Sequence, residues 1–316
     1  MDLSIVVPIF NESDNLPILC ERVTAALAES GIGYEVILVD DGSTDGSFEI
    51  MKGMALADRR WKVIRFRRNF GQTAAMAAGF SAASGRVVIP MDGDLQNDPA
   101  DIPMLLAKID EGYDVVSGWR MNRQDTFSRR LPSVLANRLI SRLTSVHLHD
   151  YGCTLKAYRR EVLDGINLYG EMHRFVPALA SQIGARVAEL PVRHHPRLHG
   201  TSKYGLSRTM RVVLDLMTVM FLLSYSTKPI QLFGKWGIYS FFAGTLSGAI
   251  TLYMKLFEHT SMNRNPLLIL TAFLLFMGVQ FIALGLLGEL NARTYYEAQG
   301  KPIYAVRETI NVDREA

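Results

Sequence analysis

Short runs rich in Val and Ile alternate with segments of helical apolar spacing through the first 117 residues, and this alternation constrains the fold most strongly. Strands are expected at 3–8, 35–39, 62–66, 86–90 and 114–117, and helices at 14–29, 45–54, 72–84 and 100–110. Strands separated by helices are typical of βαβ units, whose strands lie parallel in one sheet. The sequence therefore predicts an α/β fold with a mostly parallel central sheet.

Polar clusters directly follow three of the expected strands. They are Asn11 with Glu12, Asp40 with Asp41, and Asp92 with Asp94. Ligands of an open parallel sheet bind outside the carboxyl ends of its strands, so the clusters are expected at one edge. Neither a Walker A sequence nor a Gly-x-Gly-x-x-Gly after the first strand is present. Acidic residues in their place suit ribose hydroxyls, a base edge or a bridging cation, which indicates a nucleotide-sugar.

The segment 91–99, Met-Asp-Gly-Asp-Leu-Gln-Asn-Asp-Pro, is the strongest candidate for a metal site. Asp92, Asp94 and Gln96 offer only oxygen ligands close together in the chain. Such a site suits Mg²⁺ or Mn²⁺, which bind through one or two carboxylates and the phosphates of a substrate. An acidic turn is the alternative, because Asp, Gly and Asn are common turn formers. The neighbouring polar clusters favour the metal.

The composition narrows the classes of protein. The chain has 316 residues, 48% of them hydrophobic, and a net charge of +3, which indicates a folded protein of about two units and argues against a nucleic-acid binder. Cys20 and Cys153 lack CxxC spacing, which fits a reducing compartment. The histidines at 194, 195 and 199 lack a fourth ligand for zinc. No signal peptide is expected at the N-terminus.

Four motifs together resemble the family-2 glycosyltransferases of the GT-A fold. They are Pro8-x-Phe10-Asn11-Glu12, the run 40–45 (Asp-Asp-Gly-Ser-Thr-Asp), Arg68-Asn69-x-Gly71 and the run 92–99. The polyprenyl-phosphate glycosyltransferases, the group of dolichyl-phosphate mannose synthase, are the most similar over about residues 4–205. Phe10 stands where that family usually has Tyr, which keeps an aromatic surface but removes a hydroxyl.

The resemblance implies roles for the donor side. Nucleotide-sugar contacts fall to Pro8, Phe10, Asn11, Glu12, Asp40, Asp41 and Asp92, and to Arg197 and Lys203 of a loop resembling Arg-x-x-Gly-x-Ser-Lys. For Asp41 a helix-capping turn is the alternative. The cation would be held by Asp94 and Gln96, with Asp92 beside them facing the sugar diphosphate. Asp92 and Asp94 are thereby also catalytic candidates.

The basic stretch 118–142 indicates an anionic partner, which could be nucleic acid or a lipid phosphate. The stretch has no signature of a nucleic-acid-binding fold, which favours the lipid phosphate. The resemblance implies that the acceptor phosphate is bound by Arg120, Arg129, Ser133, Lys156 and Arg197. The motif 150–160 most resembles the branch that transfers formamido-arabinose to undecaprenyl phosphate. Asp150 is the candidate base, although a phosphate monoester is already an adequate nucleophile.

The remainder of the chain is expected at a membrane. Residues 206–230 are interpreted as an interfacial amphipathic helix, and the apolar stretches 233–257 and 266–290 are long enough to span, with a buried hairpin as the alternative. Basic residues flank the pair, which places the catalytic domain and both termini in the cytoplasm at the inner (plasma) membrane. The domains are therefore 1–205, 206–230, 231–292 and a tail at 293–316. The resemblance implies a homo-oligomer, a tetramer.

The hypothesis from sequence is a cell-envelope enzyme that moves one sugar from a nucleotide diphosphate, UDP over GDP, to a polyprenyl phosphate such as undecaprenyl phosphate. The resemblance implies inversion at the anomeric carbon. One rival is a nucleotide-sugar-binding membrane scaffold without activity. Another is a polysaccharide synthase, which would carry a Gln-x-x-Arg-Trp motif and more spans than this sequence has.

Overall fold

The protein is described from a computed structural model. The described residues are 1–28, 30–121, 141, 146–166, 168, 172–196 and 303–312, with isolated positions between 269 and 294. The chain forms two compact units, Met1–Leu216 with Pro302–Ala316, and Met217–Lys301. Several residues singled out in the sequence lie outside the described residues: Arg129, Ser133, Arg197, His199, Lys203, and almost all of the expected spans. Within the described residues, no helix is long and apolar enough to cross a membrane.

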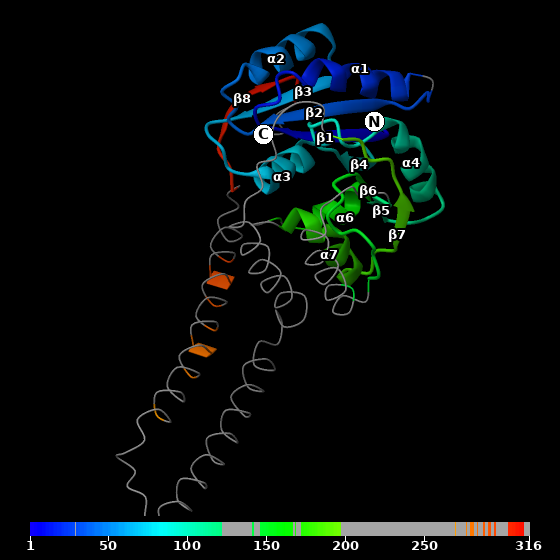
Figure 1. Cartoon of the computed structure of the whole chain (residues 1–316), viewed down its shortest axis with the longest axis vertical. Coiled ribbons are helices and arrows are strands. Elements are labelled where there is room, and N and C mark those ends of the chain that lie inside the picture. The colour runs from blue at the N-terminus through cyan, green and yellow to red at the C-terminus, as the bar shows by residue number, and fades with distance from the viewer. Residues whose placement is uncertain are drawn as a thin grey trace, which may run out of the picture. The chain divides into compact units, whose positions relative to one another are not determined.

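An eight-stranded sheet organises the first unit, in the order β7-β5-β6-β4-β1-β2-β3-β8 (Figure 1). The strands are β1 Leu3–Ile9, β2 Tyr34–Asp40, β3 Trp61–Phe66, β4 Val87–Pro90, β5 Val115–Trp119, β6 Lys156–Arg159, β7 Val187–Pro191 and β8 Val306–Ile310. The four strands from β4 to β3 run parallel, with β1 in the middle. The predicted α/β class and all five predicted strands are thus confirmed.

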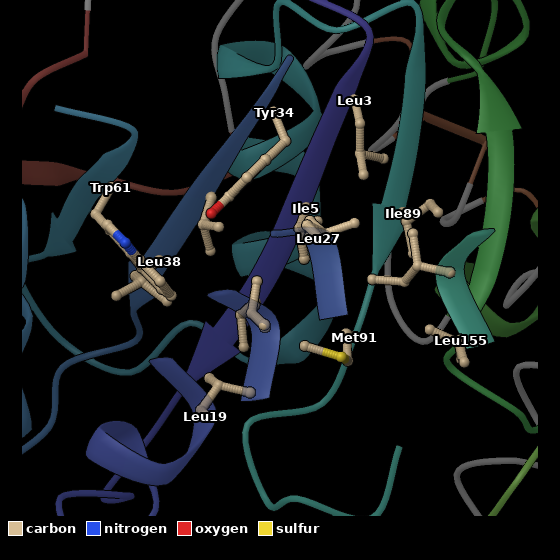
Figure 2. Close-up of a cluster of buried hydrophobic side chains, with 14 of the residues drawn as sticks. Leu3, Ile5, Leu19, Leu27, Tyr34, Leu38, Trp61, Ile89, Met91 and Leu155 are labelled. Carbon is tan, nitrogen blue, oxygen red and sulfur yellow. The ribbon is translucent and has the colours of Figure 1, made fainter. Parts of the chain in front are cut away.

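Helices cover the sheet on both sides. They are α1 Leu16–Leu27, α2 Ser47–Ala57, α3 Gln72–Ala82, α4 Ile102–Asp110, α6 Arg160–Asp164 and α7 Val176–Gln182, with short 3-10 turns η1 Pro99–Asp101 and η2 Met172–Phe175. Alternate residues of a strand point to opposite faces. Leu3, Ile5, Val7 and Ile9 therefore join one core with the apolar faces of α1, α2 and α4 (Figure 2). On the opposite face α3 packs against β1 and β2.

Covering both faces explains the sequence of the central strands. Almost every side chain of β1 and every one of β2 is buried, so both alternating sets must be apolar, as in parallel sheets generally. Ser4, Glu35 and Asp40 are polar exceptions in these two strands, and the Ser4 hydroxyl donates to Glu35 at 2.6 Å. A continuous apolar run was therefore a sound signal for a buried strand.

Three strands of the sheet were not predicted, namely β6 in its interior and β7 and β8 at its two edges. β6 runs antiparallel between β4 and β5, β7 lies parallel to β5, and β8 lies antiparallel to β3. β8 falls in the segment predicted as a tail, where Val306-Arg-Glu-Thr-Ile310 has too little apolar character to signal a strand. Asn311 fastens its end by donating to the carbonyl oxygens of Ala55 and Trp61.

Candidate active site

The three polar clusters expected at one edge lie there, because β2, β1 and β4 are parallel neighbours. Asn11, with φ of +56°, leaves β1 through a left-handed turn. Its side-chain oxygen accepts the N–H of Thr44 at 2.8 Å, and its own N–H donates to the Ser43 hydroxyl at 3.0 Å. Asn11 thus fastens the loop after β1 to the loop after β2. Glu12 accepts from the Asn15 amide at 2.6 Å within the same turn.

Asp40, the last residue of β2, carries a buried oxygen with unused bonding capacity. Its Oδ1 accepts the N–H of Ser43 at 2.8 Å. Its Oδ2 accepts no hydrogen bond from the described residues, and Arg65 Nε lies 3.5 Å away as an ion-pair partner. A buried carboxylate oxygen is costly without a donor, so this atom is a candidate acceptor for a ligand N–H or hydroxyl.

Asp41 organises the Arg68–Gly71 motif. Its two oxygens accept the N–H groups of Phe70 and Gly71 at 2.6 and 2.9 Å. Burial raises its pKa to about 6, although these two hydrogen bonds act in the opposite direction. Next to it, Gly42 has φ of +76°, and a Cβ there would lie 2.7 Å from the Arg68 backbone. Asp41 therefore supports the loop before α3 rather than capping α2. The N-cap residue of α2 is Gly46, and the N–H of Ser47 at the start of the helix is accepted by Asp45.

Asp92, directly beyond β4, is held from two sides. Its Oδ1 accepts from the side-chain amide of Gln72 at 2.9 Å and its Oδ2 from the hydroxyl of Thr154 at 2.7 Å. Burial, followed by the nearby Asp94 charge, raises the pKa of Asp92, against the opposing effects of Thr154 and Arg120. Neither Gln72 nor Thr154 was singled out in the sequence. Thr154 lies inside the motif 150–160, which is the one signal that could have identified it.

Asp94 and Gln96 form a tight turn suited to a divalent cation. Asp94 is buried, and its Oδ1 accepts the N–H of Gln96 at 3.2 Å. Leu95 between them has φ of +62°, an uncommon conformation for Leu. The donor set is a carboxylate and an amide oxygen, which fits Mg²⁺ or Mn²⁺. The described residues contain no group of three or more His, Cys, Asp or Glu placed for a metal ion.

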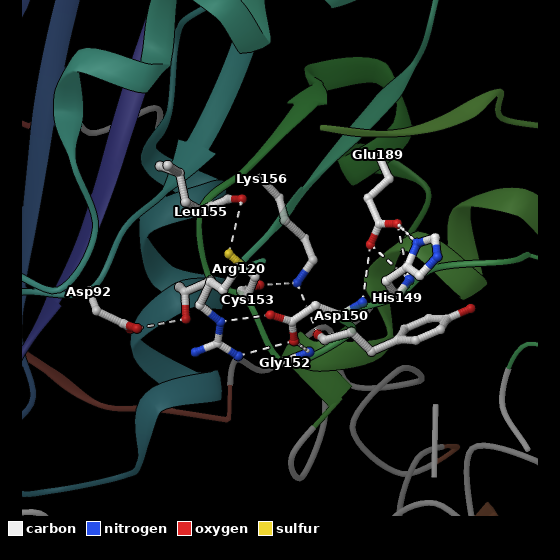
Figure 3. Close-up of polar contacts among 11 residues, drawn as sticks. Asp92, Arg120, His149, Asp150, Gly152, Cys153, Leu155, Lys156 and Glu189 are labelled. Atoms are coloured by element: carbon white, nitrogen blue, oxygen red, sulfur yellow. Dashed lines mark hydrogen bonds and ion pairs between the residues drawn. The ribbon is translucent and has the colours of Figure 1, made fainter. Parts of the chain in front are cut away.

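Arg120 and Asp150 form a buried bidentate pair. Nε of Arg120 donates to Oδ2 of Asp150 at 2.7 Å, and its Nη2 donates to Oδ1 at 3.0 Å (Figure 3). Burial favours the neutral guanidine, but the bonds to Asp150 outweigh it and raise the pKa of Arg120. Asp150 also accepts the N–H of Gly152. The carboxylate is thereby engaged in orienting Arg120.

Lys156, at the start of β6, is almost fully buried. Its ammonium donates to the carbonyl oxygens of Tyr151 and Cys153, and burial lowers its pKa. The side chain therefore contacts the loop ahead of its own strand. A contact with the acceptor phosphate stays a prediction for Lys156.

Two histidine contacts border the site. The Nε2 atom of His195 lies 3.1 Å from the Asp98 carboxylate. The backbone N–H of His195 donates to the carbonyl oxygen of Gln96, so this residue lies beside the turn formed by Asp94 and Gln96. His173 of η2 hydrogen-bonds the hydroxyl of Thr73 on α3 at 2.7 Å. Neither contact was expected, because an isolated histidine gives no signal of its partner in sequence.

A nucleotide-sugar transferase of the GT-A fold is the class that this sheet and its acidic edge define. The chain belongs to glycosyl transferase family 2, whose sequence pattern matches residues 4–166. The predicted family and enzyme class are thus confirmed.

Curated relatives match along nearly the whole chain. A dodecaprenyl-phosphate galacturonate synthase of Rhizobium johnstonii is 44% identical, over 100% of this chain and 95% of the relative. An undecaprenyl-phosphate 4-deoxy-4-formamido-L-arabinose transferase of Aeromonas hydrophila is 39% identical, over 98% of this chain and 94% of the relative.

The fold also resembles solved structures. Glucosyl-3-phosphoglycerate synthase from Mycobacterium tuberculosis, in complex with Mn²⁺, UDP and glucosyl-3-phosphoglycerate, aligns with a TM-score of 0.54 at 21% identity. The alignment covers 69% of this chain and 79% of that chain. At this identity the likeness supports the fold alone.

Proposed function

We propose that the protein transfers one sugar from a nucleotide diphosphate sugar, UDP-linked, to a polyprenyl phosphate such as undecaprenyl phosphate. The observation that carries this proposal is the full-length similarity to two enzymes that are both named for a polyprenyl-phosphate product or acceptor. Their sugars differ, a uronic acid in one name and a formamido pentose in the other. The proposal therefore names the acceptor class and leaves the sugar to experiment.

The donor nucleotide binds at the loops after β1 and β2. The unused Oδ2 of Asp40 accepts a donor group of the base or ribose, and Phe10 provides an aromatic face for stacking. Pro8, Glu12 and Lys203 complete the proposed contacts, as the family resemblance implies. Asn11 and Asp41 support this pocket by fixing its loops, since their oxygens bond backbone N–H groups.

Asp94 and Gln96, with Asp92 beside them, hold a divalent cation. With Mg²⁺ or Mn²⁺ held by these residues, the site would supply positive charge opposite the departing nucleotide diphosphate. The support for this assignment is the all-oxygen donor set that the buried Asp94 and Gln96 bring together in one turn. Asp92 itself is oriented toward the sugar diphosphate by Gln72 and Thr154.

Arg120 binds the acceptor phosphate, and Asp150 orients its guanidinium. Arginine suits this role because it stays charged and presents several N–H donors. The phosphate oxygen attacks the anomeric carbon in a single displacement, which inverts its configuration. Because Asp150 is paired with Arg120, we assign it orientation in place of the role of base. Arg129, Ser133 and Arg197 are proposed as further phosphate ligands.

The second unit anchors the enzyme in the inner membrane with two spans, following an interfacial segment at 206–230. Four described positions support this proposal, because large apolar side chains are exposed on a helix there: Ile269, Phe276, Val279 and Leu287. Such exposure is unfavourable in water and favourable in lipid. The catalytic unit and both termini lie in the cytoplasm, and the protein assembles as a homo-oligomer, proposed to be a tetramer.

The test uses the full-length protein in detergent with Mg²⁺ or Mn²⁺, a short-chain polyprenyl phosphate and a panel of UDP- and GDP-sugars. Nucleotide release that depends on both the lipid phosphate and the cation supports the proposal and identifies the donor. Nucleotide binding without release for any donor would instead support the alternative, a binding scaffold without activity.

A further inference from the structure

Residues 149–154 form a loop on the acceptor side. It is held between two oppositely charged side chains, Lys156 of β6 and Glu189 of β7 (Figure 3). On β7, Glu189 accepts the backbone N–H groups of the first two loop residues at 2.9 and 3.1 Å. On β6, Lys156 donates to the carbonyl oxygens of Tyr151 and Cys153. The carboxylate thus satisfies donors of the loop and the ammonium satisfies its acceptors.

The sheet register places the two charges on one face. Lys156 of β6 lies opposite Ser117 of β5, and Ser117 lies opposite Glu189 of β7. Directly opposite residues of neighbouring strands present their side chains on the same face. Ser117 is small and fully buried, so it leaves room for the two long side chains to reach the loop.

The loop approaches the sheet closely at Gly118, the next residue of β5. A Cβ at Gly118 would lie 2.6 Å from the carbonyl oxygen of Leu155 and 3.1 Å from the sulfur of Cys153. Cys153 is consequently buried, with 1% of its surface exposed. Its thiol therefore reports whether the loop keeps this position.

The same loop also carries two side chains, Asp150 and Thr154, that contact residues of the proposed acceptor and donor sites. Asp150 forms the bidentate pair with Arg120, and Thr154 donates to Asp92. Anything that fixes the loop backbone fixes these two contacts as well. Hydrogen bonds to charged partners are about twice as strong as neutral ones, which makes a Lys and a Glu effective at this position.

Resting on the function proposed above, we propose that Lys156 and Glu189 are positioning residues that fix the 149–154 loop and thereby aim Arg120 at the acceptor phosphate. Neither side chain has to touch a substrate. Lys156 is 2% exposed and the Glu189 side chain 11%, and both bond to the loop backbone. The role of Lys156 is then indirect, which differs from the phosphate contact expected from the sequence.

The first test measures the loop without any substrate. Cys20→Ser makes Cys153 the only thiol of the chain, and its reaction rate with a maleimide is followed in the full-length protein. Glu189→Ala and Lys156→Met are each expected to speed the reaction about tenfold or more, because local opening becomes easier. Glu189→Gln keeps an oxygen acceptor and should show a smaller increase. Glu111→Ala is the matched control: this exposed carboxylate directly follows α4 and is paired only with Lys108 in the described contacts.

The second test separates the substrates kinetically. Glu189 bonds residues 149 and 150, at the end of the loop that carries Asp150 and not at the Thr154 end. Glu189→Ala should therefore raise the KM for polyprenyl phosphate about tenfold and leave the KM for the nucleotide-sugar within about twofold. Glu189→Gln should restore part of the lipid-phosphate KM. A purely structural weakening would change both KM values or only the amount of active protein, and rescue by Gln would not be selective for the acceptor.

The two proposals fail in distinguishable ways. If Glu189→Ala leaves both the Cys153 rate and the lipid-phosphate KM unchanged while the wild type transfers sugar, the positioning role is wrong and the transferase stands. If the wild type transfers no sugar, the function is wrong. The rate of maleimide reaction at Cys153 then still tests whether Lys156 and Glu189 fix the loop. An unchanged rate in both Glu189→Ala and Lys156→Met would show that they do not.

Discussion

The donor edge and the acceptor-side loop are built by different means. The donor edge is the sheet edge where the loops after the parallel strands β1, β2 and β4 lie side by side. The side chains of Asn11 and Asp41 fix these loops by accepting backbone N–H groups. On the acceptor side, Arg120 meets Asp150 thirty residues later, and Glu189 supports the pair from another strand. The first arrangement follows from parallel topology alone. The second depends on β6 inserting antiparallel between β4 and β5.

Sequence motifs singled out residues on both sides, but only the structure shows that Asp150 and Glu189 hold Arg120 in place. A metal-binding or nucleotide-binding residue on the donor side should therefore affect chemistry for every acceptor. A residue on the acceptor side should act selectively on lipid-phosphate use. Substitutions at Asp94, Arg120, Thr154 and Asp41 are expected to have progressively smaller effects on activity or stability.

The largest effect is expected at Asp94. Asp94→Asn removes the charged ligand of the proposed cation site and should lower kcat by about 10²- to 10³-fold, as for other losses of transition-state charge stabilisation. Nucleotide release with saturating lipid phosphate measures it, with Glu111→Ala as the control. Full turnover of the variant in excess EDTA would show that the cation assignment is wrong.

The second largest effect is expected for Arg120→Lys. Lysine keeps the charge but cannot form the bidentate pair with Asp150, so kcat/KM for the lipid phosphate should fall about 10- to 100-fold with little change in donor KM. Asp150→Asn should give a similar but smaller loss through misorientation of Arg120. Equal losses for donor and acceptor would break the contrast between the two sides.

Thr154 joins the two sides, so its variant should give an intermediate pattern. Thr154→Val removes the hydroxyl that donates to Asp92 and should cost about tenfold in kcat, the lower end of the range for one hydrogen bond to a charged group. Thr154→Ser should retain most of the activity. A Thr154→Val enzyme with unchanged kcat would mean that Asp92 does not need this bond.

The smallest effect concerns stability and pH at Asp41. Its pKa is raised from 3.8 to about 6 in the folded protein. The folded state therefore binds this proton more tightly than the unfolded state, and stability falls as pH rises from about 4 to about 6. Thermal unfolding of the wild type and Asp41→Asn across this range measures the difference. Identical pH slopes would show that Asp41 does not titrate in this way.

The sequence predicted the β1–β5 core and the donor edge because both depend on local signals. Continuous apolar runs mark buried strands, and Asp92, Asp94 and Asp40 directly follow them. Gln72, Thr154 and Glu189 could not be singled out, because their partners are distant in the chain and polar residues on helices and edge strands look alike. β8 was missed for the same reason, since its pairing with β3 and the stacking of Tyr304 on Phe66 are long-range.

The most direct test of the central claim is to identify the lipid product. The full-length protein is incubated with the donor found active, a divalent cation and a short-chain polyprenyl phosphate, and the lipid is analysed by mass spectrometry. We expect a mass gain of one sugar on the phosphate, with one nucleotide diphosphate released per product. Release of nucleotide without a glycosylated lipid phosphate, or addition of several sugars to one lipid, would contradict the account.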